Sequence, residues 1–420
     1  MVLSELLIYG GKPLIGSVKV SGAKNSVLKL MAASLLTKEP CVIKNVPNLS
    51  DVQKMISLLT DLGTEAKWLA PGTLYLHNDQ QLNYYGSEKL MREMRASILI
   101  LGPLLARTNK AHVYYPGGCA IGPRPIDLHL KGLEALGATV EKEQGGVLYI
   151  YTKGLKGNRI YLDFPSVGAT ENILMAAVMA EGRTTIENAA KEPELVELQR
   201  FLTAMGANIH GAGTDTIVVE GVKKLKGTEY SVLADRIEVG TFLLAGAITG
   251  GSVKVYGARA DHNEALLYKL HESGSEINIG TNYIEVKNSN KPSAIRIRTM
   301  PYPGFPTDLQ PQIVALLTIA DGTSLITETV FPDRFKYVHE LIRLGANIVI
   351  EGECAIVKGV RKLKGAKMEA ADLRGGAALV LAALSATGES RVGQLEHLDR
   401  GYENFSDKLV MLGAEVERHN

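Results

Sequence analysis

The chain has 420 residues and a formal net charge of +1, with 45% hydrophobic and 22% charged residues. A single core rarely grows beyond about 300 residues, so this length predicts two domains. The composition is typical of a globular protein and argues against a disordered or fibrous chain. The balanced charge argues against nucleic acid or an anionic membrane as a partner.

Three cysteines lie far apart, at Cys41, Cys119 and Cys354, and form no CxxC pair. A disulfide framework or a cysteine zinc site is therefore not expected. The nine histidines show no HxH or HExxH spacing, so no metal site is predicted. The N-terminus lacks the basic region of a signal peptide, and the longest apolar runs are too short to span a bilayer. We expect a cytoplasmic protein with no membrane partner.

A short signature recurs six times, about 70 residues apart: a helical apolar pattern, a glycine, and then a strand-like run. Each glycine is expected in the left-handed position that ends a helix. In the first repeat, Ser50 and Gln53 fit a capping box at the start of this helix. The six glycines are Gly63, Gly137, Gly206, Gly274, Gly345 and Gly413.

A second helix-like stretch in each repeat gives a unit of the form β-α-β-α-β-β. Such a unit has apolar helix and sheet faces that it cannot bury alone. Three units per domain, giving two similar α/β domains with a cleft between them, is the simplest arrangement. A continuous solenoid of six units is the alternative. The second helices are expected to begin near Ala23, Arg95, Ala169, Val239, Leu309 and Gly375.

Departures from the repeat are where function is expected. The first is the segment SGAKNS at 21–26, where Lys24 and backbone N–H groups at a helix start suit a phosphate or carboxylate. A capped helix start with a solvated lysine is the alternative reading.

The largest departure is the segment 115–125, with three glycines and three prolines. Such a segment is neither helix nor central strand, and long shaped loops are often functional. Beside Arg124, Cys119 is a candidate nucleophile or acid because a neighbouring cation lowers the pKa of a thiol. A surface turn with an incidental cysteine is the alternative.

A proline-rich segment at 301–310 brings Asp308 to the start of a helix, either as a general base or only as an N-cap. Several arginines also lie near helix entries. Each arginine taken alone is expected to be a surface or salt-bridge residue, but together they could line an anion-binding cleft. These features predict a repeat protein that binds a phosphorylated or carboxylated metabolite. The arginines are Arg95, Arg236, Arg334, Arg374 and Arg400.

These segments resemble the enolpyruvyl transferase family over essentially the whole chain, and within it the members that act on UDP-N-acetylglucosamine. The loop with Cys119 is the most discriminating feature, because the shikimate-pathway relatives lack it. The matching motifs are SGAKNSVL at 21–28, MRAS at 94–97, PGGCAIGPRPIDLH at 116–129, SVGATENI at 166–173, NAAKEPE at 188–194, DRIEVGTF at 235–242, FPTDLQ at 305–310, TETVFPDRF at 327–335, ADLRGG at 371–376 and HLDRGYE at 397–403.

The resemblance implies two inside-out α/β domains, each of three βαβαββ repeats, with the active site in the cleft between them. One domain is expected at 23–232, and the other at 1–22 with 233–420. The resemblance also implies transfer of enolpyruvate from phosphoenolpyruvate to the 3-hydroxyl of UDP-N-acetylglucosamine. The expected route is addition and then elimination, with release of phosphate and without a cofactor. This is the first committed step of peptidoglycan synthesis. Transfer to shikimate 3-phosphate, or an inactive paralogue acting as a binding module, are the alternatives.

The resemblance also implies roles for residues. Cys119 is the expected proton donor and the thiol that fosfomycin alkylates, and Asp308 the base for the sugar hydroxyl. Lys24 and Arg400 complete the expected catalytic set. The expected binding residues are Lys24, Asn25, Arg95 and Arg124, then Pro125, Ile126, Asp127, Leu128 and His129, then Ser166, Val167 and Gly168, then Asp308, Val330, Arg334 and Arg374. Many members carry lysine where this chain has Phe164, so packing is expected to replace a contact to the nucleotide half.

Overall fold

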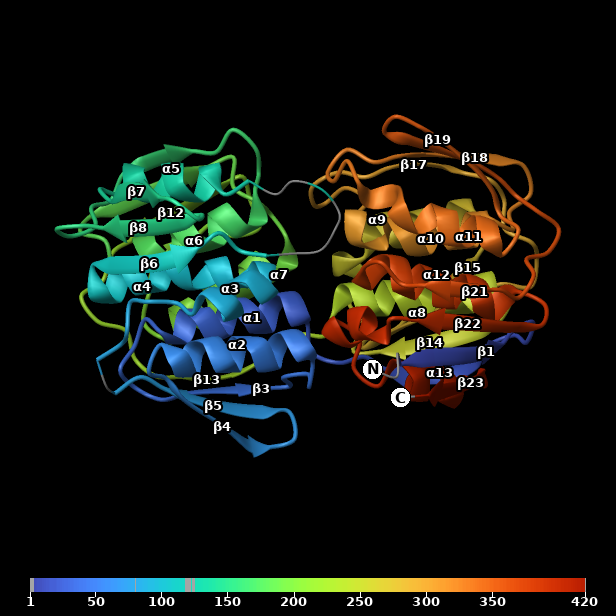
Figure 1. Cartoon of the computed structure of the whole chain (residues 1–420), viewed down its shortest axis with the longest axis horizontal. Helices are drawn as coiled ribbons and strands as arrows, with labels where there is room; N and C mark the ends of the chain where they lie inside the picture. The colour runs from blue at the N-terminus through green and yellow to red at the C-terminus, as the bar shows by residue number, and fades with distance from the viewer. Residues whose placement is uncertain (1–3, 80, 118–121, 123–124, 420) are drawn as a thin grey trace. The chain divides into compact units, whose positions relative to one another are not determined.

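The computed structural model describes residues 4–79, 81–117, 122 and 125–419. They form two compact units, which are described separately. We call residues 22–117 with 125–233 the N-terminal unit, and residues 4–21, 122 and 234–419 the C-terminal unit. Each unit contains three sheets around a central group of helices, which confirms the predicted α/β class with three repeats in each half (Figure 1).

The N-terminal unit has the sheets β13-β3-β5-β4, β6-β8-β7 and β11-β12-β10-β9. Its strands are β3 (Cys41–Lys44), β4 (Glu65–Ala70), β5 (Thr73–His77), β6 (Lys110–Tyr114), β7 (Thr139–Glu143), β8 (Val147–Tyr151), β9 (Arg159–Tyr161), β10 (Arg183–Glu187), β11 (Asn208–His210), β12 (Thr216–Glu220) and β13 (Glu229–Ser231). Its helices are α1 (Lys24–Ser34), α2 (Ser50–Asp61), α3 (Glu88–Glu93), η1 (Arg95–Ile100), α4 (Leu101–Thr108), α5 (Asp127–Ala135), α6 (Val167–Ala177) and α7 (Pro193–Ala204).

The C-terminal unit has the sheets β21-β22-β1-β23, β15-β16-β14-β2 and β17-β18-β20-β19. Its strands are β1 (Glu5–Tyr9), β2 (Ile15–Lys19), β14 (Ser252–Tyr256), β15 (Glu276–Ile279), β16 (Tyr283–Lys287), β17 (Arg296–Arg298), β18 (Thr323–Thr327), β19 (Asn347–Glu351), β20 (Cys354–Lys358), β21 (Lys367–Glu369), β22 (Glu389–Gly393) and β23 (Glu415–His419). Its helices are α8 (Arg236–Ile248), η2 (Ala260–His262), α9 (Glu264–Glu272), η3 (Thr307–Leu309), α10 (Gln310–Leu317), η4 (Arg334–Tyr337), α11 (Val338–Arg343), α12 (Leu373–Ser385), η5 (Leu395–Arg400) and α13 (Phe405–Met411).

The repeat signature corresponds to real structure. The six signature glycines all have positive φ, between 89° and 102°, as the helix-ending position requires. In both units a short strand pairs in parallel with the first strand of an antiparallel group, as β9 does with β10 and β17 with β18.

The helices between the sheets are mostly apolar, and their residues are buried on nearly all sides. In α12 every residue from Leu373 to Leu384 is buried, and α10 is buried throughout. Figure 1 shows α8, α10 and α12 in the middle of the C-terminal unit, with strands outside them. The strands instead alternate between buried and partly exposed residues, as in β20, because only one sheet face meets the helices.

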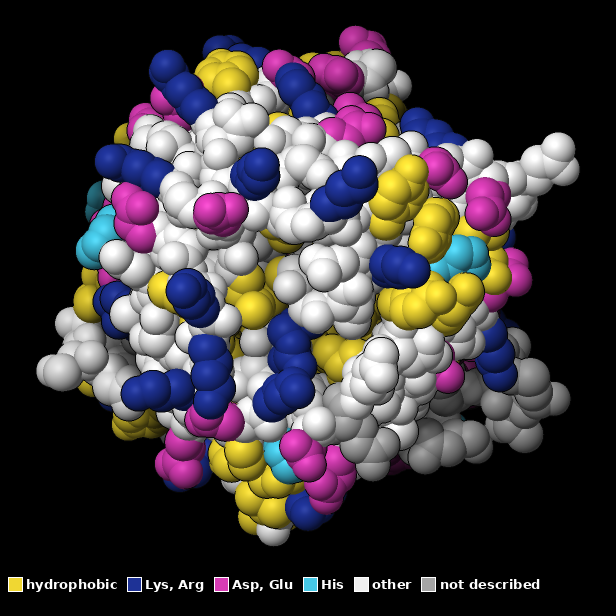
Figure 2. Space-filling view, turned by 90° about the vertical axis from the view of Figure 1, so that its left-hand side faces the viewer, with side chains coloured by type: hydrophobic (Ala, Val, Ile, Leu, Met, Phe, Trp, Pro, Cys, Tyr) yellow, Lys and Arg dark blue, Asp and Glu magenta, His cyan; other side chains and the backbone are white. Residues whose placement is uncertain are grey.

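Charged side chains of both signs are interspersed on the face of the N-terminal unit that Figure 2 shows, in line with the balanced composition. Within the described ranges, no helix has the length and hydropathy needed to cross a bilayer. The predicted capping box is wrong: Leu49 is the N-cap of α2, and the Ser50 hydroxyl is buried without a hydrogen-bond partner among the described residues.

Candidate active site

The predicted site residues are distributed over both units. Cys119 and Arg124 lie outside the described residues. In the N-terminal unit, the expected residues gather at the beginnings of α1, η1, α5 and α6. In the C-terminal unit, they gather around η3 and the starts of η4 and α12.

Lys24 is the first residue of α1, and it is buried rather than solvated. Its Nζ lies 2.6 Å from Oδ2 of Asp51, which is buried in the first turn of α2. The reading of this segment as a helix start with a solvated lysine is therefore wrong. Asn25, the next residue, is exposed. A buried lysine with a carboxylate partner is held in place, so its ammonium group is an ordered cation.

The starts of α5 and α6 meet through His129 and Gly168. A side chain at Gly168 would begin 3.0 Å from the His129 ring, so glycine allows the two helices to approach this closely. Ser166 caps α6 by accepting a hydrogen bond from the backbone N–H of Ala169. Ile126 and His129 are buried, whereas Pro125 and Asp127 are exposed.

Asn172, which we did not single out from the sequence, connects these elements. Its amide nitrogen donates to the Ile98 carbonyl at 3.0 Å and lies 2.8 Å from Nδ1 of His129. Its Oδ1 accepts from the backbone N–H of Gly102 at 2.8 Å. Because an amide NH₂ only donates, Nδ1 of His129 accepts, and the proton of the neutral ring is on Nε2. Asn172 thus fixes the start of α5 relative to η1.

Arg95 begins η1 and is partly exposed. Its Nη2 donates to the Pro125 carbonyl at 3.4 Å, which brings two predicted binding segments together. Phe164 is 46% exposed, so its ring is not packed into the core of the unit.

The C-terminal unit places Asp308 between two buried guanidinium groups. Nη2 of Arg334 donates to Oδ1 at 3.0 Å, and Nη2 and Nε of Arg374 donate to Oδ2 at 3.0 and 3.2 Å. Arg334 also donates twice to the Thr307 carbonyl. The two arginines are 2% and 4% exposed, so they are not the surface residues that each alone suggested. Asp308 forms no side-chain cap, so the N-cap reading is wrong.

The two arginines control the charge of Asp308. Burial alone would raise the pKa of this carboxyl, but the guanidinium groups of Arg374 and Arg334 outweigh burial and hold the pKa well below its usual range. Asp308 is therefore ionised at neutral pH, and it is a weak base.

Arg374 has capacity for a further ligand. Its guanidinium lies over the ring of buried Tyr402, whose hydroxyl is bonded to Thr241 and Gln312. Its Nη1 is buried and donates to no described residue. A buried cationic donor without an acceptor is costly, which points to an anion at this position.

Glu328 is the second residue that sequence reasoning missed. Its buried carboxylate accepts hydrogen bonds from the hydroxyls of Thr299 and Thr307, at 2.8 and 3.0 Å. It also accepts from the backbone N–H groups of Val330 and Phe331, at 2.8 and 3.1 Å. One side chain therefore ties the residue before Asp308 to the segment that carries Val330. Its donors are spread over more than 30 positions of the chain, so no local pattern reveals this role.

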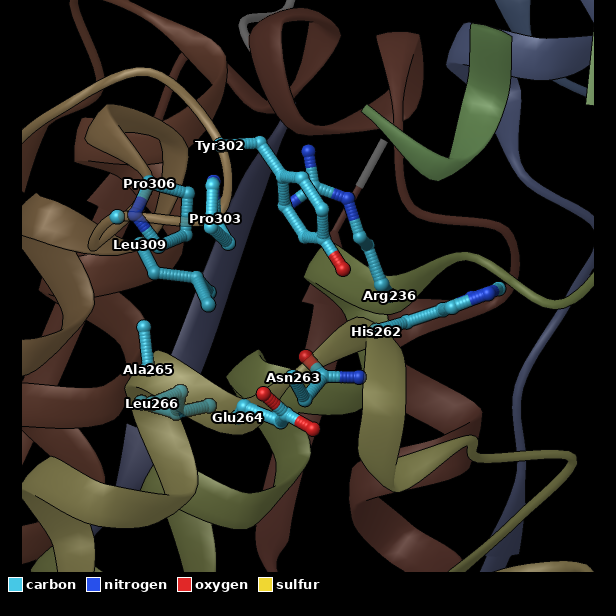
Figure 3. A pocket seen from close by; sticks show the side chains of 11 residues that line it. Arg236, His262, Asn263, Glu264, Ala265, Leu266, Tyr302, Pro303, Pro306 and Leu309 are labelled. Carbon is cyan, nitrogen blue, oxygen red and sulfur yellow. The ribbon is translucent and has the colours of Figure 1, made fainter. Parts of the chain in front are cut away.

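A narrow pocket lies beside this cluster, between the start of α8, α9 and the segment before Asp308 (Figure 3). The Arg236 guanidinium lies over the Tyr302 ring, 5.6 Å from its centre. The pocket has a free volume of only about 10 Å³, too small for a metabolite. Arg236 contributes instead through its charge, which also lowers the pKa of Asp308. Arg400 ends η5 and is partly exposed.

Two units of three repeats, with helices inside and sheets outside, define an inside-out α/β fold. The chain belongs to the enolpyruvyl transferase family: the family model described as EPSP synthase (3-phosphoshikimate 1-carboxyvinyltransferase) matches residues 8–409.

Curated relatives are similar over 90% or more of their length. A protein of Caldanaerobacter subterraneus subsp. tengcongensis, named UDP-N-acetylglucosamine 1-carboxyvinyltransferase 2, is 51% identical over 99% of this chain and 100% of its own. A protein of Gloeobacter violaceus, named UDP-N-acetylglucosamine 1-carboxyvinyltransferase, is 51% identical over 99% of this chain and 90% of its own.

Solved structures share the fold. The enolpyruvyl transferase NikO of Streptomyces tendae has a TM-score of 0.90 at 24% identity, covering 99% of both chains. EPSP synthase of Acinetobacter baumannii has a TM-score of 0.77 at 19% identity, covering 100% of both chains.

Proposed function

We propose that this protein transfers the enolpyruvyl group of phosphoenolpyruvate to the 3-hydroxyl of UDP-N-acetylglucosamine and releases phosphate. The names of the relatives that are about 50% identical support this acceptor. The observation that carries the chemistry is Asp308, held between two buried arginines, one of which has a free donor.

The proposed reaction has two steps. The sugar oxygen bonds to C2 of phosphoenolpyruvate while C3 gains a proton, which gives a tetrahedral phospho-ketal. C3 then loses a proton as the bond from C2 to the phosphate oxygen breaks, which restores the double bond and releases phosphate. In this proposal Cys119 protonates C3 and Asp308 takes the proton of the hydroxyl.

The charges around Asp308 set its strength as a base. Phosphoenolpyruvate carries a carboxylate and a phosphate, and either group can pair with Nη1 of Arg374. A bound anion would share the charge of the arginines, so the pKa of Asp308 rises when the substrate is present. The base would then become stronger only in the complex.

We further propose that residues of both units serve this reaction, with 23–232 as one catalytic domain and 1–22 with 233–420 as the other. Lys24, Arg95, Arg124 and Arg400 are the proposed phosphoenolpyruvate contacts, with Arg334 and Arg374. The proposed UDP-N-acetylglucosamine contacts are Asn25, Arg124, Pro125, Ile126, Asp127, Leu128, His129, Ser166, Val167, Gly168, Asp308 and Val330.

We also propose that the enzyme is cytoplasmic and catalyses the first committed step of peptidoglycan synthesis. It would then serve cell-wall biogenesis, cell shape and cell division. Fosfomycin would alkylate Cys119 and inactivate the enzyme over time. Intact-mass analysis should find one adduct, on Cys119 and not on buried Cys41, whose thiol pKa is raised to about 11 by burial. A Cys119→Ser protein that stays fully sensitive contradicts this assignment.

Release of phosphate from phosphoenolpyruvate tests the function. It should require UDP-N-acetylglucosamine and should not occur with shikimate 3-phosphate. Arg400→Ala should lose about 2–4 kcal/mol of transition-state stabilisation. The matched control is Arg391→Ala, which removes an exposed arginine paired with Glu389 and should leave the rate unchanged. Turnover with shikimate 3-phosphate alone, or with neither acceptor, refutes the proposal.

A further inference from the structure

A shallow concavity of about 500 Å³ opens on the C-terminal unit between α9 and the short strand β17. It shares no residue with the cluster of Asp308, Arg334 and Arg374. Its volume is in the range of pockets that hold small metabolites. Three cations and several apolar side chains face it, among them Tyr268, Lys269, Arg296, Arg298, Phe305 and Leu325.

The positive charge of this pocket is largely uncompensated. Arg296 and Arg298 are both exposed and alternate along β17, so they project from the same face of the sheet. Neither guanidinium forms an ion pair or a hydrogen bond with any residue that the structure describes. Lys269 pairs with Glu272 of its own helix at 2.6 Å. The pocket therefore offers two guanidinium forks with free donors.

The internal repeat provides a comparison. In the third repeat, Arg159 begins β9 and pairs with Glu187, the last residue of β10, at 2.8 Å. In the fifth repeat, Arg296 begins β17 in the same way, but the last residue of β18 is Thr327. The acid that neutralises this position in one repeat is thus replaced by a neutral residue in the other, where a second arginine is also present.

Apolar surface lies next to the free guanidinium groups. Tyr268 is 68% exposed and Leu325 is 37% exposed, and both line the pocket. A planar ring can stack on the tyrosine while the arginines bind an anion, because guanidinium groups match phosphate oxygens in pairs.

We infer that this pocket binds a phosphomonoester of a molecule that also contains a planar ring. The phosphate lies between Arg296 and Arg298, and the ring packs against Tyr268 and Leu325. This ligand is distinct from the two substrates of the proposed reaction, and its binding does not depend on that reaction.

Isothermal titration calorimetry with adenosine 5′-monophosphate, and with adenosine as the uncharged probe, tests the inference. Saturating UDP-N-acetylglucosamine is present to occupy the proposed nucleotide-sugar site. The monophosphate should bind at one site and at least about tenfold more tightly than adenosine, because charge-assisted hydrogen bonds contribute that much each. Equal binding of the two probes overturns the inference.

Variants locate the site. Arg296→Gln with Arg298→Gln should weaken monophosphate binding at least about tenfold, with unchanged phosphate release from phosphoenolpyruvate. The matched control, Arg159→Gln with Arg183→Gln, also removes two exposed guanidinium groups and should bind normally. Thr327→Glu keeps both arginines and restores the acid of the third repeat, so it should also lose binding. Normal binding by either pocket variant overturns the inference, whether or not the proposed reaction is correct.

Discussion

Replacing Asp308 by asparagine tests the charge balance of the candidate site. The substitution keeps the size of the side chain but leaves Arg334 and Arg374 without their counter-charge. Breaking a buried pair costs about 3–5 kcal/mol, and since the Asp308 side chain is 29% exposed we expect about 2–4 kcal/mol at pH 7. The measurement is the free energy of unfolding in urea.

The stabilisation by Asp308 should decrease as the pH is lowered. The pKa of Asp308 is lower in the folded protein than in the unfolded chain, so the unfolded state binds more protons as the pH falls. The stabilisation is fully present above about pH 5 and is lost progressively at lower pH, by roughly 1 kcal/mol at pH 3. The difference in the free energy of unfolding between wild type and Asp308→Asn should therefore become smaller as the pH is lowered.

A control separates this effect from the loss of any surface carboxylate. Asp333 is half-exposed and pairs with Lys336, so Asp333→Asn should change stability by no more than about 0.5 kcal/mol. Equal stability of wild type and Asp308→Asn at pH 7, or a gap that does not change with pH, refutes the reasoning.

Three further predictions concern buried polar groups. Glu328→Ala should lower kcat/KM at least about tenfold, because Thr307 loses its hydrogen-bond acceptor. Glu328→Gln keeps an acceptor and should restore most of the activity. Equal rates for the two variants would contradict the positioning role of Glu328. Asn172→Ala should raise KM for UDP-N-acetylglucosamine but not for phosphoenolpyruvate, because it releases His129; an equal rise in both would contradict this. Burial raises the pKa of Glu238 to about 7, so the contribution of this carboxyl to stability should fall by roughly 3 kcal/mol between pH 4.5 and 7. In urea titrations of Glu238→Gln, the free energy of unfolding should change less with pH than in wild type. The same pH dependence in both proteins would exclude this carboxyl as the cause.

The repeat was predictable because its signal is local. A helix pattern followed by a glycine needs only neighbouring residues, and the positive φ of Gly63 and Gly345 follows from that pattern. The capping box failed for the same reason. Ser50 has the right spacing to Gln53, but the helix begins one residue earlier than a serine cap requires. Local spacing cannot decide between two adjacent starts.

The partners in the site were less predictable because folding brings them together from distant positions. The sequence has five arginines near predicted helix entries. Nothing in their spacing indicated that Arg334 and Arg374 would be buried and would each bind one carboxylate oxygen of Asp308. A single glutamate such as Glu328 carries no signature either. Its role appears only when its four donors converge.

The transferred carbon atoms provide the most direct test of the central claim. With ¹³C-labelled phosphoenolpyruvate and unlabelled UDP-N-acetylglucosamine, NMR of the product should show the labelled enolpyruvyl group in an ether bond to the 3-oxygen of the sugar, with one phosphate released per label transferred. Label that stays in phosphoenolpyruvate, or that appears on shikimate 3-phosphate when both acceptors compete, would contradict the account.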